Sequence, residues 1–111
     1  MSDLTFNKYQ ELALRTASVD REEDQRKIIA ALGLAGEAGE FANLIKKLTA
    51  HGHAISTEKL VEELGDVLWY LSEAASACGL TLDNIAENNI AKLVERYPDG
   101  FSHESSINRK N

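Results

Sequence analysis

The sequence predicts an all-α protein, and three observations support this fold class. Apolar residues recur at three- and four-residue steps in four successive segments, which is the periodicity of amphipathic helices. The 111 residues contain one proline and only 6% aromatic residues, a composition that favours helices over a β-sandwich. Ser, Thr and Gly stand where these segments should begin and end. We therefore expect a four-helix-bundle-like domain.

The first two helices are predicted over residues 5–17 and 20–50. The second begins in the acidic run that follows Asp20 and ends before Gly52. The first has its helical repeat at Phe6, Tyr9, Leu12, Ala13 and Thr16. The main apolar stripe of the second is Leu34, Ala38, Phe41, Ile45 and Leu48.

Glycine occurs at every third position of the second helix, at Gly33, Gly36 and Gly39. Each glycine costs about 1 kcal/mol of helix propensity relative to alanine. Two interpretations remain open. The glycines allow either a close approach of another helix or room for a ligand.

The third helix is predicted from a cap at Ser56 or Thr57 to Cys78, and it ends at Gly79. Trp69 points away from its main apolar face, toward a second surface. A helix that is apolar on two sides is central in its domain or lies at an oligomer interface, and we favour the interface. Trp69 would then either pack there or stack on a base. The main apolar face is Leu60, Leu64, Val67, Leu68, Leu71 and Ala75.

The fourth helix is predicted from a cap at Thr81 to the residue before Pro98. Its candidate buried residues are Ile85, Leu93 and Tyr97. We expect one helical domain over residues 1–101 and a polar tail over residues 102–111.

The overall composition excludes several classes of protein. Hydrophobic residues make up 43% and charged residues 27% of the chain, as in folded globular proteins. A net charge of −6 argues against binding to a nucleic acid polymer. Cys78 is the only cysteine, no signal peptide is visible, and we expect no apolar run to be long enough to span a bilayer. We therefore expect a cytoplasmic protein without a membrane partner.

Two acidic pairs lie inside otherwise apolar segments. Glu37 and Glu40 form one pair, and Glu63 and Asp66 form the other. A spacing of three residues places both carboxylates of a pair on one helical face, about 60° apart. At about 4 Å and an effective dielectric near 20, each like-charged contact costs about 4 kcal/mol. A shared divalent cation would remove this cost, and Mg²⁺, with Mn²⁺ as an alternative, prefers such oxygen ligands. Glu62 is rotated by about 100° and should face solvent.

A set of polar and cationic side chains could accompany this centre. Asn89, Lys92 and Arg96 share one face of the fourth helix, and Lys47 lies near the Glu40 side of the second. Arg makes forked hydrogen bonds to phosphate, and Lys acts as a point charge. Metal ions and cations around a polyphosphate are the groups that phosphoryl chemistry requires.

Histidines offer no comparable metal site. A di-iron centre would need Glu-x-x-His pairs, and none of the three histidines stands in that relation to a glutamate. We interpret His51 and His53 as solvated loop residues.

Three motifs resemble the MazG-type nucleoside triphosphate pyrophosphohydrolases. They are Gly36-Glu37-Ala38-Gly39-Glu40, the stretch Glu-Glu-Leu-Gly-Asp-Val-Leu-Trp-Tyr-Leu over residues 62–71, and the stretch from Asn89 to Phe101. The opening Phe6-x-x-Tyr9-Gln10 is also similar to single-domain members. The resemblance implies an all-α fold completed by oligomerisation, as a dimer or a dimer of dimers. It further implies Mg²⁺-dependent hydrolysis of a nucleoside triphosphate to the monophosphate and pyrophosphate.

The resemblance also assigns roles to individual residues. It implies that Glu37 or Glu40 activates the attacking water as the catalytic residue. The preferred base stays open, and the alternative function is a non-catalytic helical regulatory or binding module. The implied metal ligands are Glu37, Glu40, Glu63 and Asp66. The implied contacts to phosphate or ribose are Lys47, Asn89, Lys92 and Arg96.

Overall fold

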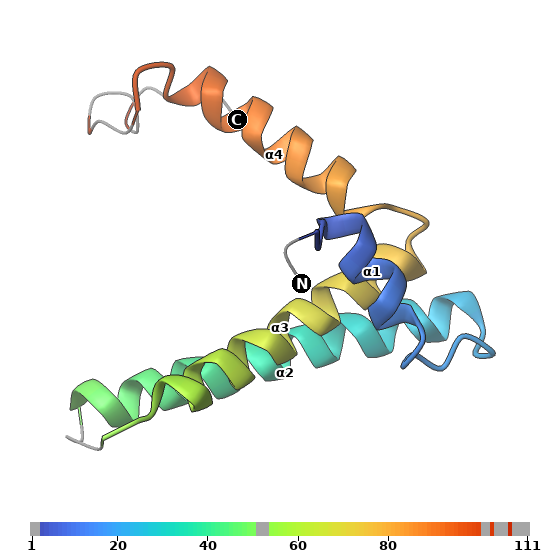
Figure 1. The fold of residues 1–111 in the computed structure, drawn as a ribbon, viewed down its shortest axis with the longest axis horizontal. Helices are drawn as coiled ribbons and strands as arrows, with labels where there is room; N and C mark the ends of the chain where they lie inside the picture. Colours follow the sequence, from blue (N-terminus) through green and yellow to red (C-terminus); the bar gives the residue numbers. More distant parts are fainter. Residues whose placement is uncertain (1–2, 51–53, 101–102, 104–106, 108–111) are drawn as a thin grey trace.

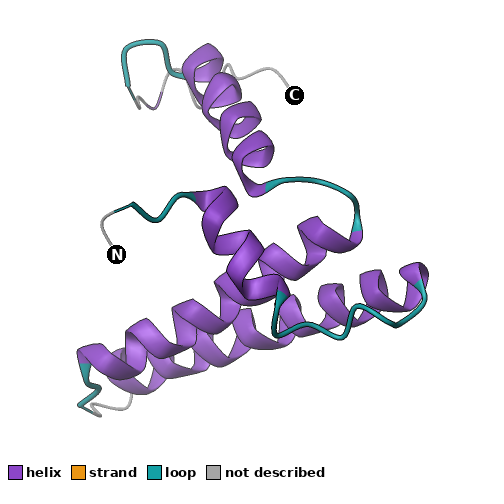
Figure 2. Cartoon of the chain, turned by 45° about the vertical axis from the view of Figure 1, so that its right-hand side comes forward, coloured by secondary structure: helices purple, strands orange, loops and turns teal. Residues whose placement is uncertain are grey.

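The computed structural model describes residues 3–50, 54–100, 103 and 107, and these residues form four α-helices and no β-strand. The predicted all-α class is therefore confirmed. Helices α2 and α3 lie side by side as an antiparallel pair, α1 crosses α3, and α4 extends away from the pair (Figures 1 and 2). The helices are α1 (Phe6–Leu14), α2 (Glu23–Ala50), α3 (Thr57–Ala77) and α4 (Leu82–Arg96).

Hydroxyl caps begin three of the helices at the positions that the sequence predicts. The side chain of Thr5 accepts a hydrogen bond from the Lys8 amide at 3.0 Å. Ser56, rather than Thr57, caps α3, and Thr81 caps α4. Gly79 follows α3 with a φ of 71°, the left-handed conformation that favours glycine. Helix α1 ends earlier than predicted because residues 15–17 turn more tightly, with each amide bonded to the carbonyl three residues back.

Gln10 and Trp69 hold α1 against the rest of the chain. The Gln10 amide donates to Ser76 Oγ at 3.0 Å and to the Leu80 carbonyl at 2.9 Å, and its oxygen accepts from the Leu82 amide at 2.8 Å. The Trp69 indole donates to Thr16 Oγ1 at 2.8 Å. The second surface of α3 is therefore covered by α1 of the same chain, so Trp69 gives no reason to infer an oligomer interface.

The three glycines of α2 have different surroundings. A Cβ atom at Gly33 would overlap the ring of Tyr70, so α2 and α3 approach closely here. Nothing in the part of the chain that the structure describes lies within 4 Å of a Cβ atom added at Gly36 or Gly39. Within one chain, close packing of α2 against α3 thus explains the glycine at position 33 but not those at positions 36 and 39.

Large apolar side chains are poorly covered in the single chain. Among the described residues, the buried apolar side chains are Ala30, Ala75, Ala77 and Leu82. The prediction that Ile85 and Leu93 are buried is wrong, since they are 37% and 39% exposed. The reason is that α4 packs mainly against α1 and not along α2 and α3.

The overall dimensions also indicate an open structure. The accessible surface is 8185 Å², whereas a compact monomer of 12.2 kDa exposes about 6,100 Å². The radius of gyration is 17.0 Å, against about 13 Å for a compact domain of this length. The chain leaves roughly 2,000 Å² more surface uncovered than a closed globule would.

Helix α2 is long and apolar enough, by length and composition alone, to cross a membrane. The expectation that no apolar run is long enough is therefore wrong. The helix has 28 residues, and alanines and glycines between its larger apolar side chains keep the run apolar. It also carries Glu37 and Glu40 near its middle, and charged side chains are costly in lipid.

Several expectations are not tested by the structure. His51 and His53 lie outside the described residues, as does the proposed tail except for His103 and Ile107, which are exposed. The boundary at residue 101 and the cytoplasmic location stay predictions.

Candidate metal centre

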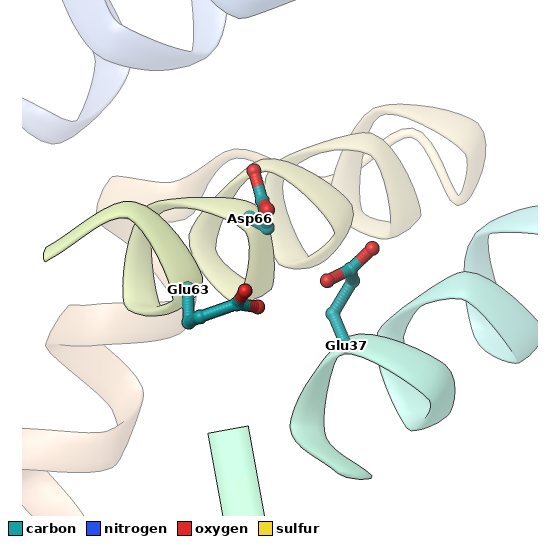
Figure 3. Close-up of side chains that lie close together, drawn as sticks. All are labelled: Glu37, Glu63 and Asp66. Carbon is teal, nitrogen blue, oxygen red and sulfur yellow. The ribbon is translucent and has the colours of Figure 1, made fainter. Parts of the chain in front are cut away.

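Three carboxylates from two helices meet in one place. Glu37 extends from α2, while Glu63 and Asp66 extend from successive turns of α3 (Figure 3). One oxygen from each lies within 4.8 Å of the others. The antiparallel pairing of α2 and α3 brings Glu37 opposite the acidic pair, and the three-residue spacing directs both side chains of that pair toward it. We call this cluster the acidic centre.

The electrostatics of the acidic centre show that the carboxylates repel one another. Glu37 is half-buried, and the Glu63 side chain is 12% exposed. The pKa of Glu37 is raised above its ordinary value of 4.5, first by desolvation and then by the charges of Asp66, Glu63 and Glu40. Protons or a cation would relieve this repulsion.

Lys59 supplies partial neutralisation from within the chain. Its ammonium lies 3.2 Å from Glu63 Oε1 and 3.8 Å from Glu62 Oε1. The hydrogen bond to Glu63 is the main reason that the pKa of Lys59 is raised. Glu62 is 65% exposed, which confirms that it faces solvent. One ammonium facing three carboxylates leaves the centre with excess negative charge.

Glu40 is not part of the acidic centre. Its side chain is exposed, and its charge has the smallest effect among those that raise the pKa of Glu37. A metal-binding or catalytic role for Glu40 stays a prediction.

The proposed phosphate-binding residues do not gather at the acidic centre within one chain. Lys47 is exposed in the last turn of α2. Asn89, Lys92 and Arg96 lie on α4, which extends away from α2 and α3 (Figure 1). Arg96 Nε is buried and has no hydrogen-bond partner among the described residues. A single chain therefore supplies the carboxylates but does not place the cations beside them.

Tyr9 is a neighbour of the acidic centre that the sequence did not assign to the site. Burial raises the pKa of its phenol, and the charge of Asp66 raises it further. Helix α1 thus brings a phenol to the Asp66 side of the centre. Its position in the apolar repeat of the first helix gave no sign of this, because the two residues are far apart in the sequence.

The donor set fits a hard divalent cation. All three groups are carboxylates, and oxygen ligands of this kind select Mg²⁺ or Mn²⁺ over softer metals. Glu37, Glu63 and Asp66 would hold such an ion, and water or substrate oxygens would complete its shell.

Comparison with known proteins identifies the family. A family model described as the MazG nucleotide pyrophosphohydrolase domain matches residues 25–101, which include the whole acidic centre. The chain is 37% identical over 82 residues to the Gene 37 protein of Mycobacterium phage L5, covering 70% of this chain and 72% of that protein. No solved structure gives a significant match. This chain belongs to the MazG nucleotide pyrophosphohydrolase domain family.

Proposed function

We propose that the protein is a Mg²⁺-dependent enzyme that hydrolyses a nucleoside triphosphate, with ribose or deoxyribose, to the monophosphate and pyrophosphate. The observation that carries this proposal is the convergence of Glu37, Glu63 and Asp66, whose charge Lys59 offsets only in part. Family membership agrees with it. The net charge of −6 favours a free nucleotide over a nucleic acid polymer as the substrate.

In the proposed reaction, the metal ion and the carboxylates of the chain have different roles. A bound Mg²⁺ or Mn²⁺ would neutralise phosphate oxygens and acidify a water molecule. Glu37, or Glu40 beside it on α2, would accept the proton as the water oxygen bonds to phosphorus. The bond that breaks joins phosphorus to the oxygen between the α- and β-phosphates, and pyrophosphate leaves. The position of Glu37 suits this role because its half-buried carboxylate lies at the centre that would hold the ion and its bound water.

A second copy of the chain would complete the site. The roughly 2,000 Å² of extra exposed surface per chain is in the range that obligate homodimers bury. The α4 helix of a second copy would bring Asn89, Lys92 and Arg96 to the acidic centre, where the two cations could contact phosphate. Protein rather than lipid would cover the apolar surface of α2, because its central carboxylates disfavour a bilayer. The assembly is a dimer or a dimer of dimers.

The function is tested by incubating the protein with each of the common NTPs and dNTPs and Mg²⁺, and measuring monophosphate and pyrophosphate. Glu63→Gln should lower kcat/KM by more than about 100-fold, because even outer-shell partners of metal ligands cost 10–100-fold. Glu62→Gln is the matched control: it removes the neighbouring charge, which faces solvent, and should retain wild-type activity. Circular dichroism should show unchanged helicity in both variants.

Two results would contradict the proposal. Wild-type turnover by Glu63→Gln would show that the acidic centre is not the metal site. No hydrolysis of any nucleotide, together with no Mg²⁺ binding, would favour the non-catalytic regulatory or binding module.

A further inference from the structure

A hollow lies between α2, α3 and the loop that follows α1. Its volume is about 110 Å³, and it opens to solvent on one side. We call it the Trp69 pocket. The lining residues used below are Ser18, Arg26, Ile29, Trp69, Tyr70 and Glu73.

The Trp69 pocket and the acidic centre lie along the same two helices, α2 and α3. Asp66, Tyr70 and Glu73 follow at steps of four and three residues, so they lie on the same face of α3. At 1.5 Å per residue, Tyr70 is about 6 Å and Glu73 about 10 Å beyond Asp66 along the helix. Tyr70 lies against Gly33, one turn from Glu37 on the opposite helix. The pocket thus begins about one turn from the carboxylates, a separation that the sugar of a nucleotide can span.

The walls of the Trp69 pocket suit a planar heterocycle. The rings of Trp69 and Tyr70 meet edge to face, with centroids 5.0 Å apart and an angle of 82°. Flat π-systems stack on such rings. Ile29 adds an apolar side chain.

The same pocket also has a polar wall. Arg26 Nη2 donates to Glu73 Oε1 at 2.8 Å and Nε donates to Oε2 at 3.4 Å, with the two side chains 15% and 11% exposed. Each carboxylate oxygen keeps a lone pair and the guanidinium keeps unused N–H groups, so this wall offers both acceptors and donors. A ligand with an aromatic ring and a mixed hydrogen-bonding edge matches these walls.

The volume limits the size of that ring. A cavity of about 150 Å³ holds one benzene molecule. The Trp69 pocket is smaller, at about 110 Å³, so a single six-membered ring already fills it and reaches its open side, and a fused pair of rings would extend further into solvent. A two-ring base would leave one ring in water.

We propose that the Trp69 pocket binds the base of a pyrimidine nucleotide whose phosphates lie at the acidic centre. This inference rests on the proposed function. The single ring stacks on Trp69 and meets the Tyr70 ring at an edge, and its polar edge meets the Arg26–Glu73 pair. Purine nucleotides bind less tightly because their second ring does not enter.

The test uses the fluorescence of Trp69, which is the only tryptophan in the chain. The full chain is titrated with CMP, UMP, AMP and GMP, so that binding is read without turnover. We expect Trp69 fluorescence to report a Kd about tenfold tighter for the pyrimidine than for the purine monophosphates. Equal affinity for purines and pyrimidines, or no change with any monophosphate, would overturn the proposal.

A pair of variants at Ser18 locates the binding. Ser18 is exposed in the loop and lines the pocket, so Ser18→Phe should fill it without disturbing the helices. Ser18→Phe should weaken CMP and UMP binding roughly tenfold, the scale of a lost stacking contact. Ser18→Ala, the matched control, should stay within about twofold of wild type. Unchanged affinity in Ser18→Phe would place the base elsewhere.

The hydrolysis assay separates the two proposals. Cleavage of purine and pyrimidine triphosphates with equal kcat/KM would overturn the pyrimidine assignment and leave the pyrophosphohydrolase function intact. Absence of hydrolysis would overturn the function, whereas the fluorescence titration would still decide what the Trp69 pocket binds.

Discussion

At the scale of single residues, Glu37 connects protonation to stability. Because its pKa in the folded chain is raised above the ordinary value of 4.5, the folded state binds its proton more tightly than the unfolded state does. The free energy of unfolding of the metal-free protein should therefore fall as pH rises from that value through the raised pKa.

Urea denaturation in EDTA, over a pH series that begins below 4.5, checks this expectation. Glu37→Gln cannot titrate and should lose the part of the pH dependence that Glu37 supplies, so the difference between the two proteins isolates it. Saturating Mg²⁺ should flatten the wild-type curve, since the ion replaces the proton. Identical pH profiles for wild type and Glu37→Gln would contradict the assignment of repulsion to this carboxylate.

Lys59 would compete with a bound metal ion for Glu63. Its ammonium lies 3.2 Å from one Glu63 oxygen, so Lys59→Met should free that oxygen and tighten Mg²⁺ binding about twofold, the scale of an exposed helical ion pair. Isothermal titration calorimetry measures the change. Lys8→Met removes the same charge from a similar pair with Glu11 on α1 and should leave Mg²⁺ affinity unchanged. Weaker Mg²⁺ binding in Lys59→Met would show that the lysine supports the site instead.

The sequence predicted three of the residues that meet at the acidic centre because their signal is local. Glu63 and Asp66 are three residues apart, so helical geometry places them on one face of α3, and Glu37 lies in an equally apolar helix that adjoins α3 in the sequence. The ion pair between Lys59 and Glu63 could also have been predicted from the sequence, because Lys59 precedes Glu63 by one helical turn. The influence of Asp66 on Tyr9 could not have been predicted, because it depends on how α1 crosses α3.

At the scale of helices, caps were predictable and packing was not. Thr5, Ser56 and Thr81 accept hydrogen bonds from amides three residues ahead, which is a property of the local sequence. The direction of α4 depends on which surface covers it, and its periodicity is the same whether that surface belongs to its own chain or to another. The expected burial of Ile85 and Leu93 failed for this reason.

The glycines of α2 test whether a surface of this helix is covered by the same chain or by another. Gly33→Ala should lower the free energy of unfolding by about 1–3 kcal/mol, because the new methyl group displaces Tyr70. Gly39→Ala meets nothing in the described part of the same chain and should gain about 1 kcal/mol of helix propensity. Thermal unfolding at two protein concentrations distinguishes the effects.

If a second copy packs against the open side of α2, Gly39→Ala should weaken association while Gly33→Ala does not. If both variants were destabilised equally at every protein concentration, the packing of Tyr70 against Gly33 would not be what makes Gly33 differ from Gly39.

At the scale of the whole molecule, the single chain leaves more surface exposed than a closed globule of this size would. Leu32, Val61, Ile90 and Val94 are between 59% and 69% exposed. The sequence shows that these helices are amphipathic but not whether one chain or two bury their apolar faces. The small size of the domain explains why the sequence leaves this open. A domain of this length has a small core, and association with a partner is a common way to enlarge it.

A mixing experiment tests whether the site is shared between copies. Glu63→Gln removes a carboxylate on α3 and Arg96→Ala removes a cation on α4, so each variant alone should be inactive. In a dimer whose α4 serves the partner's acidic centre, a mixed pair has one site with both defects and one site with none. Random reassembly of equal amounts should then recover about a quarter of wild-type activity. If each chain used its own α4, every site would carry a defect and no activity would return. Recovery therefore requires both association and exchange of α4 across the interface.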